Sequence, residues 1–215
     1  MIKNLHKFMA MNIWLVDIDD TLTHSVDAVI LFHNYQYGTE LKKEDFTMYS
    51  IKQALFNRHG NIISPKEEMN RMEKFYKSSF FENVQPILEM KPVIEAIANR
   101  GDIILPATGR AEAVRTQTEY MIIKNFGDYF GEFSFTEWHA GEEKNGTKKS
   151  IALKNKVNKV IDDMPGYIDQ LSQLEIIDGI YVPQNHWNKS VQETEKVKII
   201  THPQQIIEHA YSNAA

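Results

Sequence analysis

Hydrophobic and polar residues follow two rhythms along this chain, and these rhythms predict strands and helices. Short apolar runs bounded by polar residues are typical of buried parallel strands. They cover residues 13–16, 102–108, 157–162, 179–182 and 197–201. Helical patterns, several of them bounded by Gly or Pro, cover residues 91–100, 112–126, 148–155, 165–174 and the C-terminal residues. Alternation of this kind predicts an α/β fold with a Rossmann-like parallel sheet and right-handed crossovers.

Residues 24–90 interrupt this alternation, because they have helical periodicity and no strand pattern. We expect helices over 24–37, 42–56 and 65–81, the last of them capped by Ser64 with Pro65 in its first turn. The domain organisation predicted from these patterns is a helical cap at 24–90, a core made of 12–23 and 91–215, and an N-terminal extension at 1–11.

Composition narrows the classes of function. A formal net charge of −5, with no long run of Lys or Arg, argues against a dedicated partner of nucleic acid or of a membrane surface. The absence of Cys excludes disulfides, thiol nucleophiles and cysteine-bound zinc. No apolar stretch approaches membrane-spanning length, and the first residues do not resemble a secretory signal. We therefore expect a cytoplasmic protein with no membrane partner and no stable nucleic-acid partner.

Two carboxylates follow the first apolar run. Asp17 and Asp19 are two positions apart, so they leave the carboxyl end of the strand on the same side, where open α/β sheets bind ligands. Carboxylates held close together repel each other and need a cation or a shared proton. A calcium loop that opened at Asp17 would have Gly and Glu where Leu22 and Ala28 stand, so this alternative is rejected. The other alternative is that these acids cap the following helix.

The second strand ends in Thr108, Gly109 and Arg110. The Thr108 hydroxyl and the backbone N–H groups that follow it could hold a phosphoryl oxygen at a helix N-terminus. The alternative is that Thr108 is an ordinary turn residue.

The strand predicted at 157–162 ends in the adjacent acids Asp162 and Asp163. The apolar run before them places both at the edge of the sheet, although adjacent acids are also common at solvated helix starts. A lysine from the helix just upstream, which contains Lys148 and Lys149, could neutralise these carboxylates and help to bind a phosphoryl group. Most lysines in such a run are solvated, so we expect one of them at most to be functional.

The order of these motifs resembles the haloacid dehalogenase (HAD) superfamily of phosphatases over about residues 12–185. The positions that match the four motifs of the superfamily are Asp17 and Asp19, Thr108, Lys149 or Lys148, and Asp162 with Asp163. The segments 160–165 and 185–188, with 46–49 in the cap, are similar to the branch of 5′-nucleotidases and deoxyribonucleotidases. The chain departs from many members at Asp20, where they have Gly.

The resemblance implies an aspartyl-phosphate mechanism. Asp17 would attack phosphorus, and Asp19 would protonate the leaving oxygen and then deprotonate the hydrolytic water. Thr108 and Lys149 would stabilise charge on the phosphoryl oxygens. The residues expected to bind substrate are Thr108, Gly109, Arg110 and Lys148. For Arg110 the alternative is that it orients an acidic neighbour, and its spacing does not decide between the two.

The resemblance also implies a Mg²⁺ cofactor, which suits an all-oxygen site. Its expected metal residues are Asp17, Asp19 through its backbone carbonyl, Asp163, and Asp162 directly or through water.

The expected substrate is a small phosphorylated molecule, a nucleoside or deoxynucleoside 5′-monophosphate. One or two of the cap aromatics would face it; the candidates are Phe32, Tyr35, Tyr37, Phe46 and Tyr49. Two alternatives stay open: a capped phosphatase for a sugar phosphate, another small phosphate or a nucleic-acid 3′-phosphate end, and a non-catalytic protein that binds a phospholigand.

Overall fold

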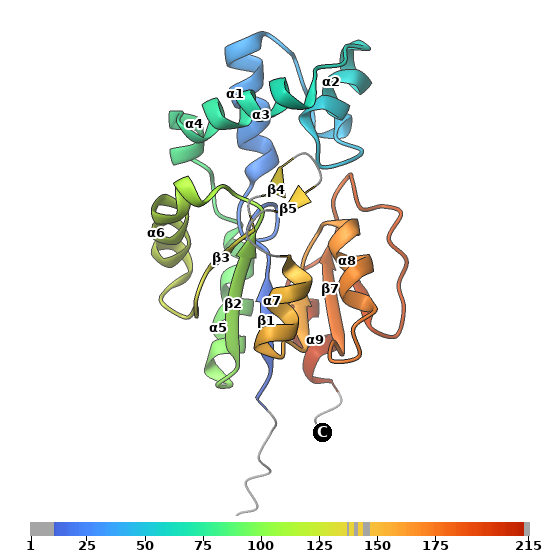
Figure 1. The fold of residues 1–215 in the computed structure, drawn as a ribbon. Helices are drawn as coiled ribbons and strands as arrows, with labels where there is room; N and C mark the ends of the chain where they lie inside the picture. The colour runs from blue at the N-terminus through green and yellow to red at the C-terminus, as the bar shows by residue number, and fades with distance from the viewer. Residues whose placement is uncertain (1–10, 137, 140–141, 144–146, 213–215) are drawn as a thin grey trace, which may run out of the picture.

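A computed structural model describes residues 11–136, 138–139, 142–143 and 147–212. In Figure 1 an α/β core forms the lower part of the molecule, and the helices that follow the first strand form a block above it. This arrangement confirms the predicted α/β fold with a helical insertion after the first strand.

The core is built on a parallel sheet. Its strands are β1 (Ile13–Val16), β2 (Ile103–Thr108), β3 (Ser134–Phe135), β6 (Lys159–Ile161), β7 (Gly179–Pro183) and β8 (Val197–Ile200), and their order is β3-β2-β1-β6-β7-β8. In the register, Leu15 lies between Leu105 of β2 and Val160 of β6. Two short antiparallel strands, β4 (Trp138–His139) and β5 (Glu142–Glu143), lie outside this sheet. The sequence pattern missed β3, β4 and β5, which are only two residues long and show no periodicity.

Helices cover both faces of the sheet. They are α5 (Lys91–Asn99), α6 (Arg115–Phe126), α7 (Lys148–Asn155), α8 (Pro165–Ser172) and α9 (Gln204–Tyr211), with the short 3₁₀ turns η2 (Leu88–Met90) and η3 (Glu112–Val114). Alternate residues of β1 point to opposite faces. Trp14 and Val16 belong to the cluster that contains α5, α6 and α9, whereas Leu15 belongs to the cluster that contains α7 and α8. The central strand is thus buried on both sides, as its apolar run predicts.

The inserted block has its own hydrophobic core. It contains α1 (Ser25–Tyr37), η1 (Lys43–Asp45), α2 (Ile51–His59), α3 (Pro65–Tyr76) and α4 (Ser79–Glu82). Buried aromatic residues, among them Phe32, Phe75 and Phe81, pack against one another at its centre.

Two of the expected cap helices are wrong in extent. The helix predicted at 42–56 is a short turn followed by α2, because the Ser50 side chain accepts a hydrogen bond from Gln53 N and starts a new helix there. The helix predicted at 65–81 is divided into α3 and α4, where the Ser78 hydroxyl donates to Phe75 O at 2.6 Å.

Two chain segments join the cap to the core, and they lie against each other. His24 N donates to Gln85 O at 2.8 Å, and Ile87 N donates to Leu22 O at 2.8 Å. The domain boundaries at residues 24 and 90 remain a prediction.

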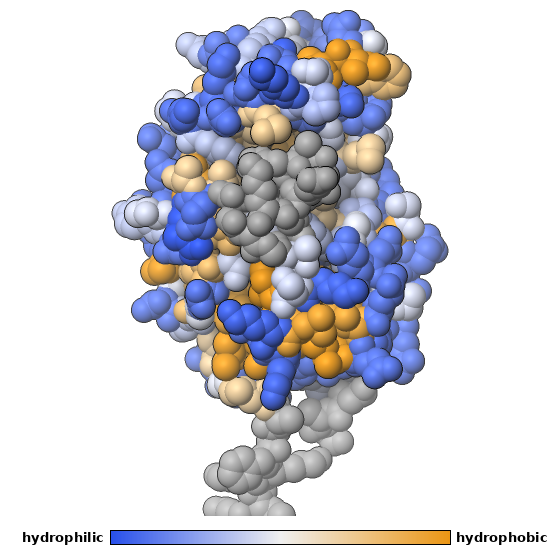
Figure 2. Space-filling model, in the orientation of Figure 1, coloured by the Kyte–Doolittle hydropathy of each residue, from blue (hydrophilic) through white to orange (hydrophobic). Residues whose placement is uncertain are grey.

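Figure 2 shows that hydrophilic residues cover most of this face of the molecule, with hydrophobic residues gathered in small areas, as is ordinary for a protein surface. Within the described residues, no helix is long and apolar enough to cross a membrane.

Candidate active site

The carboxyl ends of β1, β2 and β6 bring the sequence-predicted residues to one edge of the sheet, under the cap. The three strands are neighbours and run parallel, so the residues that follow them meet. Asp17 directly follows β1, and its N–H donates to Ile161 O of β6 at 2.9 Å. Thr108 ends β2, and Asp162 and Asp163 follow β6.

Lys148 bridges two of the carboxylates. Its Nζ lies 2.5 Å from Asp17 Oδ1 and 2.7 Å from Asp162 Oδ2, and all three side chains are buried. Burial raises the pKa of Asp17 to about 7, although the Lys148 ammonium opposes this shift and Asp162 and Asp19 add to it. Burial would lower the pKa of Lys148, but the charges of Asp162 and Asp17 raise it above its ordinary value. The ammonium therefore stays charged.

Lys148, and not Lys149, is the lysine that the structure places in this site. The expectation that Lys149 is catalytic is thus not supported by its position, because its side chain is exposed on α7. The Thr147 hydroxyl caps α7 through Ser150 N at 3.0 Å, which fixes where the helix starts. Adjacent helical residues point about 100° apart, so only one of the two lysines can face the sheet edge.

One carboxylate oxygen of Asp163 accepts hydrogen bonds and the other has no hydrogen-bond partner. Its Oδ2 accepts hydrogen bonds from Asn185 Nδ2 at 3.0 Å and Trp187 Nε1 at 2.8 Å. Its Oδ1 is buried and has no hydrogen-bond partner. A buried polar atom of this kind needs a partner, because leaving it unpaired costs roughly 1–3 kcal/mol.

The carboxylates fit a divalent cation. One oxygen each from Asp17, Asp162 and Asp163 lies within 4.8 Å of the others. Burial and repulsion between the carboxylates raise the pKa of Asp163, as burial raises that of Asp17, so the one ammonium of Lys148 does not balance the cluster and a further cation would stabilise the ionised carboxylates. Hard cations such as Mg²⁺ prefer oxygen ligands of this type. The Asp19 carboxylate is not part of the cluster, so that residue could contribute only through its backbone, as the sequence prediction has it.

Asp19 belongs to a second charge cluster. Arg110 Nη2 lies 2.8 Å from Asp19 Oδ1, Ser25 Oγ donates to Oδ1 at 2.6 Å, and Thr108 Oγ1 donates to Oδ2 at 2.9 Å. Burial would raise the pKa of Asp19, but the Arg110 charge and these hydrogen bonds hold the pKa below its ordinary value. The structure thus presents Asp19 as an oriented carboxylate.

Arg110 and Thr108 therefore both contact an acid. For Arg110 the sequence left open an acidic neighbour or the substrate, whereas for Thr108 it indicated a phosphoryl oxygen. Arg110 is 2 % exposed, and its guanidinium also donates to Thr118 Oγ1 at 3.1 Å and Thr23 Oγ1 at 3.2 Å. Thr108 Oγ1 accepts from Arg110 N at 3.2 Å. Gly109 and Arg110 also line the cavity described below, and their role in substrate binding stays a prediction.

Asp20 occupies the position where many members of the HAD superfamily have Gly. Its φ is 54°, in the left-handed region that Gly adopts most easily and Asn and Asp tolerate better than most other residues. Its carboxylate accepts a hydrogen bond from Val26 N at 3.0 Å, at the start of α1. The acid thus keeps the turn and also caps the first cap helix.

A cavity of about 720 Å³ lies between cap and core, with Asp17, Asp19 and Asp163 among its lining residues. Of the five candidate aromatics, Phe46 and Tyr49 line this cavity, whereas Phe32 is buried in the cap core and Tyr35 is 79 % exposed. The sequence did not indicate that other cap residues contribute to this wall, which they do: Val26, Val29, Ser50, Ile51, Pro65, Glu68, Met69, Met72, Glu73, Tyr76 and Lys77. Met69, Met72 and Tyr76 recur at helical spacing on α3, which is the signal that could have found them.

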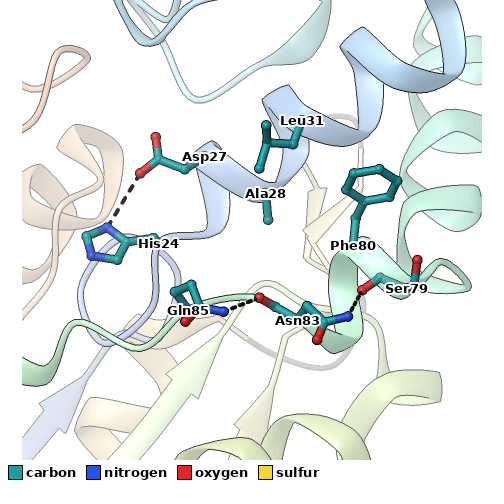
Figure 3. Close-up of a pocket in the computed structure, with 8 residues that line it drawn as sticks. All are labelled: His24, Asp27, Ala28, Leu31, Ser79, Phe80, Asn83 and Gln85. Atoms are coloured by element: carbon teal, nitrogen blue, oxygen red, sulfur yellow. Dashed lines mark hydrogen bonds and ion pairs between the residues drawn. The ribbon is translucent and has the colours of Figure 1, made fainter.

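A smaller cavity of about 380 Å³ lies beside α1 and α4 (Figure 3). Its one carboxylate, Asp27, is paired with His24 at 3.6 Å and Lys43 at 3.2 Å. Val26 and Val29 of α1 line the larger cavity, whereas Asp27 and Leu31 line this one, so the two cavities use different faces of the helix. The carboxylates that follow β1 and β6 line the larger cavity and not this one.

Comparison with known proteins gives matches in structure but not in sequence. No protein family matches the chain, and no curated protein is similar to it. A predicted phosphoglycolate phosphatase from Haemophilus somnus 129PT has a TM-score of 0.66 at 12% identity, over 94% of this chain and 99% of that one. A HAD-superfamily hydrolase of subfamily IA from Geobacter sulfurreducens PCA has a TM-score of 0.58 at 10% identity, over 93% and 96%. A HAD family hydrolase from Deinococcus radiodurans R1, solved with bound phosphate and sodium, has a TM-score of 0.58 at 14% identity, over 94% and 96%.

At these identities the likeness shows the fold. The chain has the HAD-like α/β fold with an inserted helical cap, the fold of hydrolases and phosphatases of that superfamily.

Proposed function

We propose that this protein is a Mg²⁺-dependent phosphomonoester hydrolase that acts through an aspartyl-phosphate on Asp17. The observation that carries the proposal is the buried Asp17 at the wall of the cavity between cap and core, in contact with Lys148 and beside the carboxylates of Asp162 and Asp163. Asp17, Asp162 and Asp163 would hold the cation, whose charge would offset that of the carboxylates and of the phosphoryl oxygens.

The reaction has two displacements. An Asp17 oxygen attacks phosphorus, the bond from phosphorus to the ester oxygen breaks, and Asp19 gives that oxygen a proton. Water then attacks the same phosphorus and gives its proton to Asp19, while the bond from phosphorus to Asp17 breaks. Lys148 opposes the effect of burial and so favours the ionised Asp17 that the first displacement needs, and it neutralises charge near the phosphoryl group.

Arg110 stabilises the ionised form of Asp19, which is the form that accepts a proton from water in the second displacement. The first displacement needs the protonated acid. A phosphate dianion bound beside Asp17 would raise the pKa of Asp19 by repulsion, which is the direction that this step requires.

For the substrate we propose a nucleoside or deoxynucleoside 5′-monophosphate. A cavity of about 720 Å³ is within the usual range for ligands of that size, and the half-buried Tyr49 in its wall offers a surface for a base. Stacking on one aromatic side chain contributes roughly 1–3 kcal/mol. That energy corresponds to about one to two orders of magnitude in kcat/KM.

The charge of Glu68, in the cap, would favour substrates that have no second anionic group. Its Oε1 accepts hydrogen bonds from Ser50 Oγ at 2.8 Å and Lys52 N at 3.0 Å, so the carboxylate is held at the cavity wall. A fixed carboxylate repels a second anionic group such as that of phosphoglycolate, and it accepts hydrogen bonds from the N–H groups of a base or the hydroxyls of a sugar.

The test is kcat/KM for dUMP, dTMP, AMP and GMP against glucose 6-phosphate and phosphoglycolate, at one Mg²⁺ concentration. We expect a nucleotide to exceed both other substrates by at least tenfold. We also expect Glu68→Gln to narrow the difference between that nucleotide and phosphoglycolate. A sugar phosphate that outperforms every nucleotide would reject the nucleotide assignment and leave the phosphatase assignment in place.

A further inference from the structure

Trp187 joins the predicted cation site to the cap. It is 4 % exposed, in the segment after β7, and its indole Nε1 donates to Asp163 Oδ2 at 2.8 Å. This hydrogen bond leaves Asp163 Oδ1 as the oxygen without a partner. The indole and Asn185 Nδ2, which donates at 3.0 Å, thus both hold Oδ2, and Oδ1 is the oxygen left for a cation.

The loop around Trp187 is fastened to the same residue. Asn188 Nδ2 donates to Asp163 O at 3.0 Å and to Pro183 O at 2.8 Å, and Asn188 Oδ1 accepts from Asn185 N at 2.8 Å. The backbone that carries Trp187 is therefore fixed relative to Asp163, and the indole ring is the part of the loop that reaches the cap.

The ring packs among residues of the cap. Trp187 belongs to the hydrophobic cluster of the cap. Among the described residues, Trp187 and Val114 are the two buried members of this cluster that come from the core. The Tyr49 and Trp187 rings form a T-shaped pair with a centroid distance of 5.6 Å and an interplanar angle of 82°. Tyr49 also lines the cavity between cap and core.

We propose that Trp187 is a positioning residue that couples cation binding at Asp163 to docking of the cap on the core. This inference rests on the cation site of the proposed function. A cap that moves away removes the Tyr49 contact and lets the indole turn, so Asp163 loses a donor that orients it. Because such coupling is reciprocal, a bound cation also favours the docked cap.

Two variants test separately the hydrogen bond from Trp187 to Asp163 and the ring contact between Trp187 and Tyr49. Trp187→Phe keeps an aromatic ring in the cap cluster and removes the N–H that contacts Asp163. Tyr49→Leu keeps that hydrogen bond and removes the ring contact from the cap. Trp14→Phe is the matched control, because buried Trp14 also donates its Nε1 to a carboxylate, Asp102, at 3.1 Å. Asp102 lies before β2, at the other end of the sheet.

The measurement is the affinity of each protein for Mn²⁺, an oxygen-preferring substitute for Mg²⁺, from the electron paramagnetic resonance signal of the free ion. Partners that orient a metal ligand typically account for 10–100-fold in affinity. We expect Trp187→Phe to weaken Mn²⁺ binding by that factor and Tyr49→Leu by about fivefold or more. Trp14→Phe should bind within about twofold of the wild type.

Hydrogen exchange supplies a readout independent of affinity. Mn²⁺ should slow exchange of the α2 amides in the wild type and in Trp14→Phe, and it should have no such effect in Tyr49→Leu. Wild-type affinity in either Trp187→Phe or Tyr49→Leu would overturn the coupling while leaving the hydrolase proposal intact. No Mn²⁺ binding to the wild type would overturn the cation site itself, and the coupling with it.

Discussion

Replacement of Lys148 tests the central charge arrangement of the site. Lys148→Met keeps a long flexible side chain and removes the ammonium that lies 2.5 Å from Asp17 and 2.7 Å from Asp162. Both carboxylates are buried, and removing one partner from a buried ion pair typically costs about 3–5 kcal/mol of stability. We expect a loss in this range in the free energy of unfolding of the protein freed of cations with EDTA.

The same substitution should slow catalysis by about 10²–10³-fold in kcat, the usual effect of losing one group that stabilises developing charge. Urea unfolding followed by circular dichroism measures the stability, and phosphate release from dUMP with Mg²⁺ measures the activity. Lys149→Met is the matched control: its side chain is exposed on the same helix, so we expect a change within about 0.5 kcal/mol and full activity. Equal effects of the two substitutions would refute the assignment of Lys148.

Two further predictions concern the cap. Burial, with a smaller effect of the Arg71 charge, lowers the pKa of His33 to about 4, so the folded cap binds this proton more weakly than the unfolded chain does. The contribution of His33 to stability is therefore complete above pH 6.5 and falls by up to about 3 kcal/mol as the pH drops to 4. Urea midpoints at pH 7 and pH 4.5 should differ less in His33→Leu than in the wild type, and equal differences would count against this account. Asp20→Ala should lower the free energy of unfolding by about 1–3 kcal/mol, because it loses the cap on Val26 N and places Ala at positive φ. Asn can also accept the hydrogen bond from Val26 N and adopt a positive φ, so the free energy of unfolding of Asp20→Asn should stay within about 0.5 kcal/mol of the wild type. A loss as large as that of Asp20→Ala would contradict this explanation.

The sequence was sufficient for the fold because the central strands are buried on both faces. Apolar runs such as the one that ends before Asp17 have few other interpretations, and the acids after them mark the carboxyl edge of the sheet. Helix boundaries in the cap were less predictable, because a single hydroxyl, as at Ser50 or Ser78, decides where a helix starts or ends.

The contacts within the site depend on details that periodicity does not contain. The choice between Lys148 and Lys149 depends on the rotation of α7, which is fixed by its cap. The contact of Trp187 with Asp163 joins residues 24 positions apart through a loop without periodic structure. The sequence position of Arg110 does not decide whether its side chain faces the substrate or an acid. Tertiary packing places its guanidinium against Asp19.

The most direct test of the proposed chemistry is phosphate release from dUMP by the purified protein, measured with Mg²⁺, after exhaustive EDTA treatment, and after Mg²⁺ is restored. We predict turnover with Mg²⁺, loss of turnover with EDTA, recovery when Mg²⁺ is restored, and no turnover by Asp17→Asn under any of these conditions. Turnover that survives EDTA would contradict the cation requirement, and an Asp17→Asn variant as active as the wild type would remove Asp17 as the nucleophile.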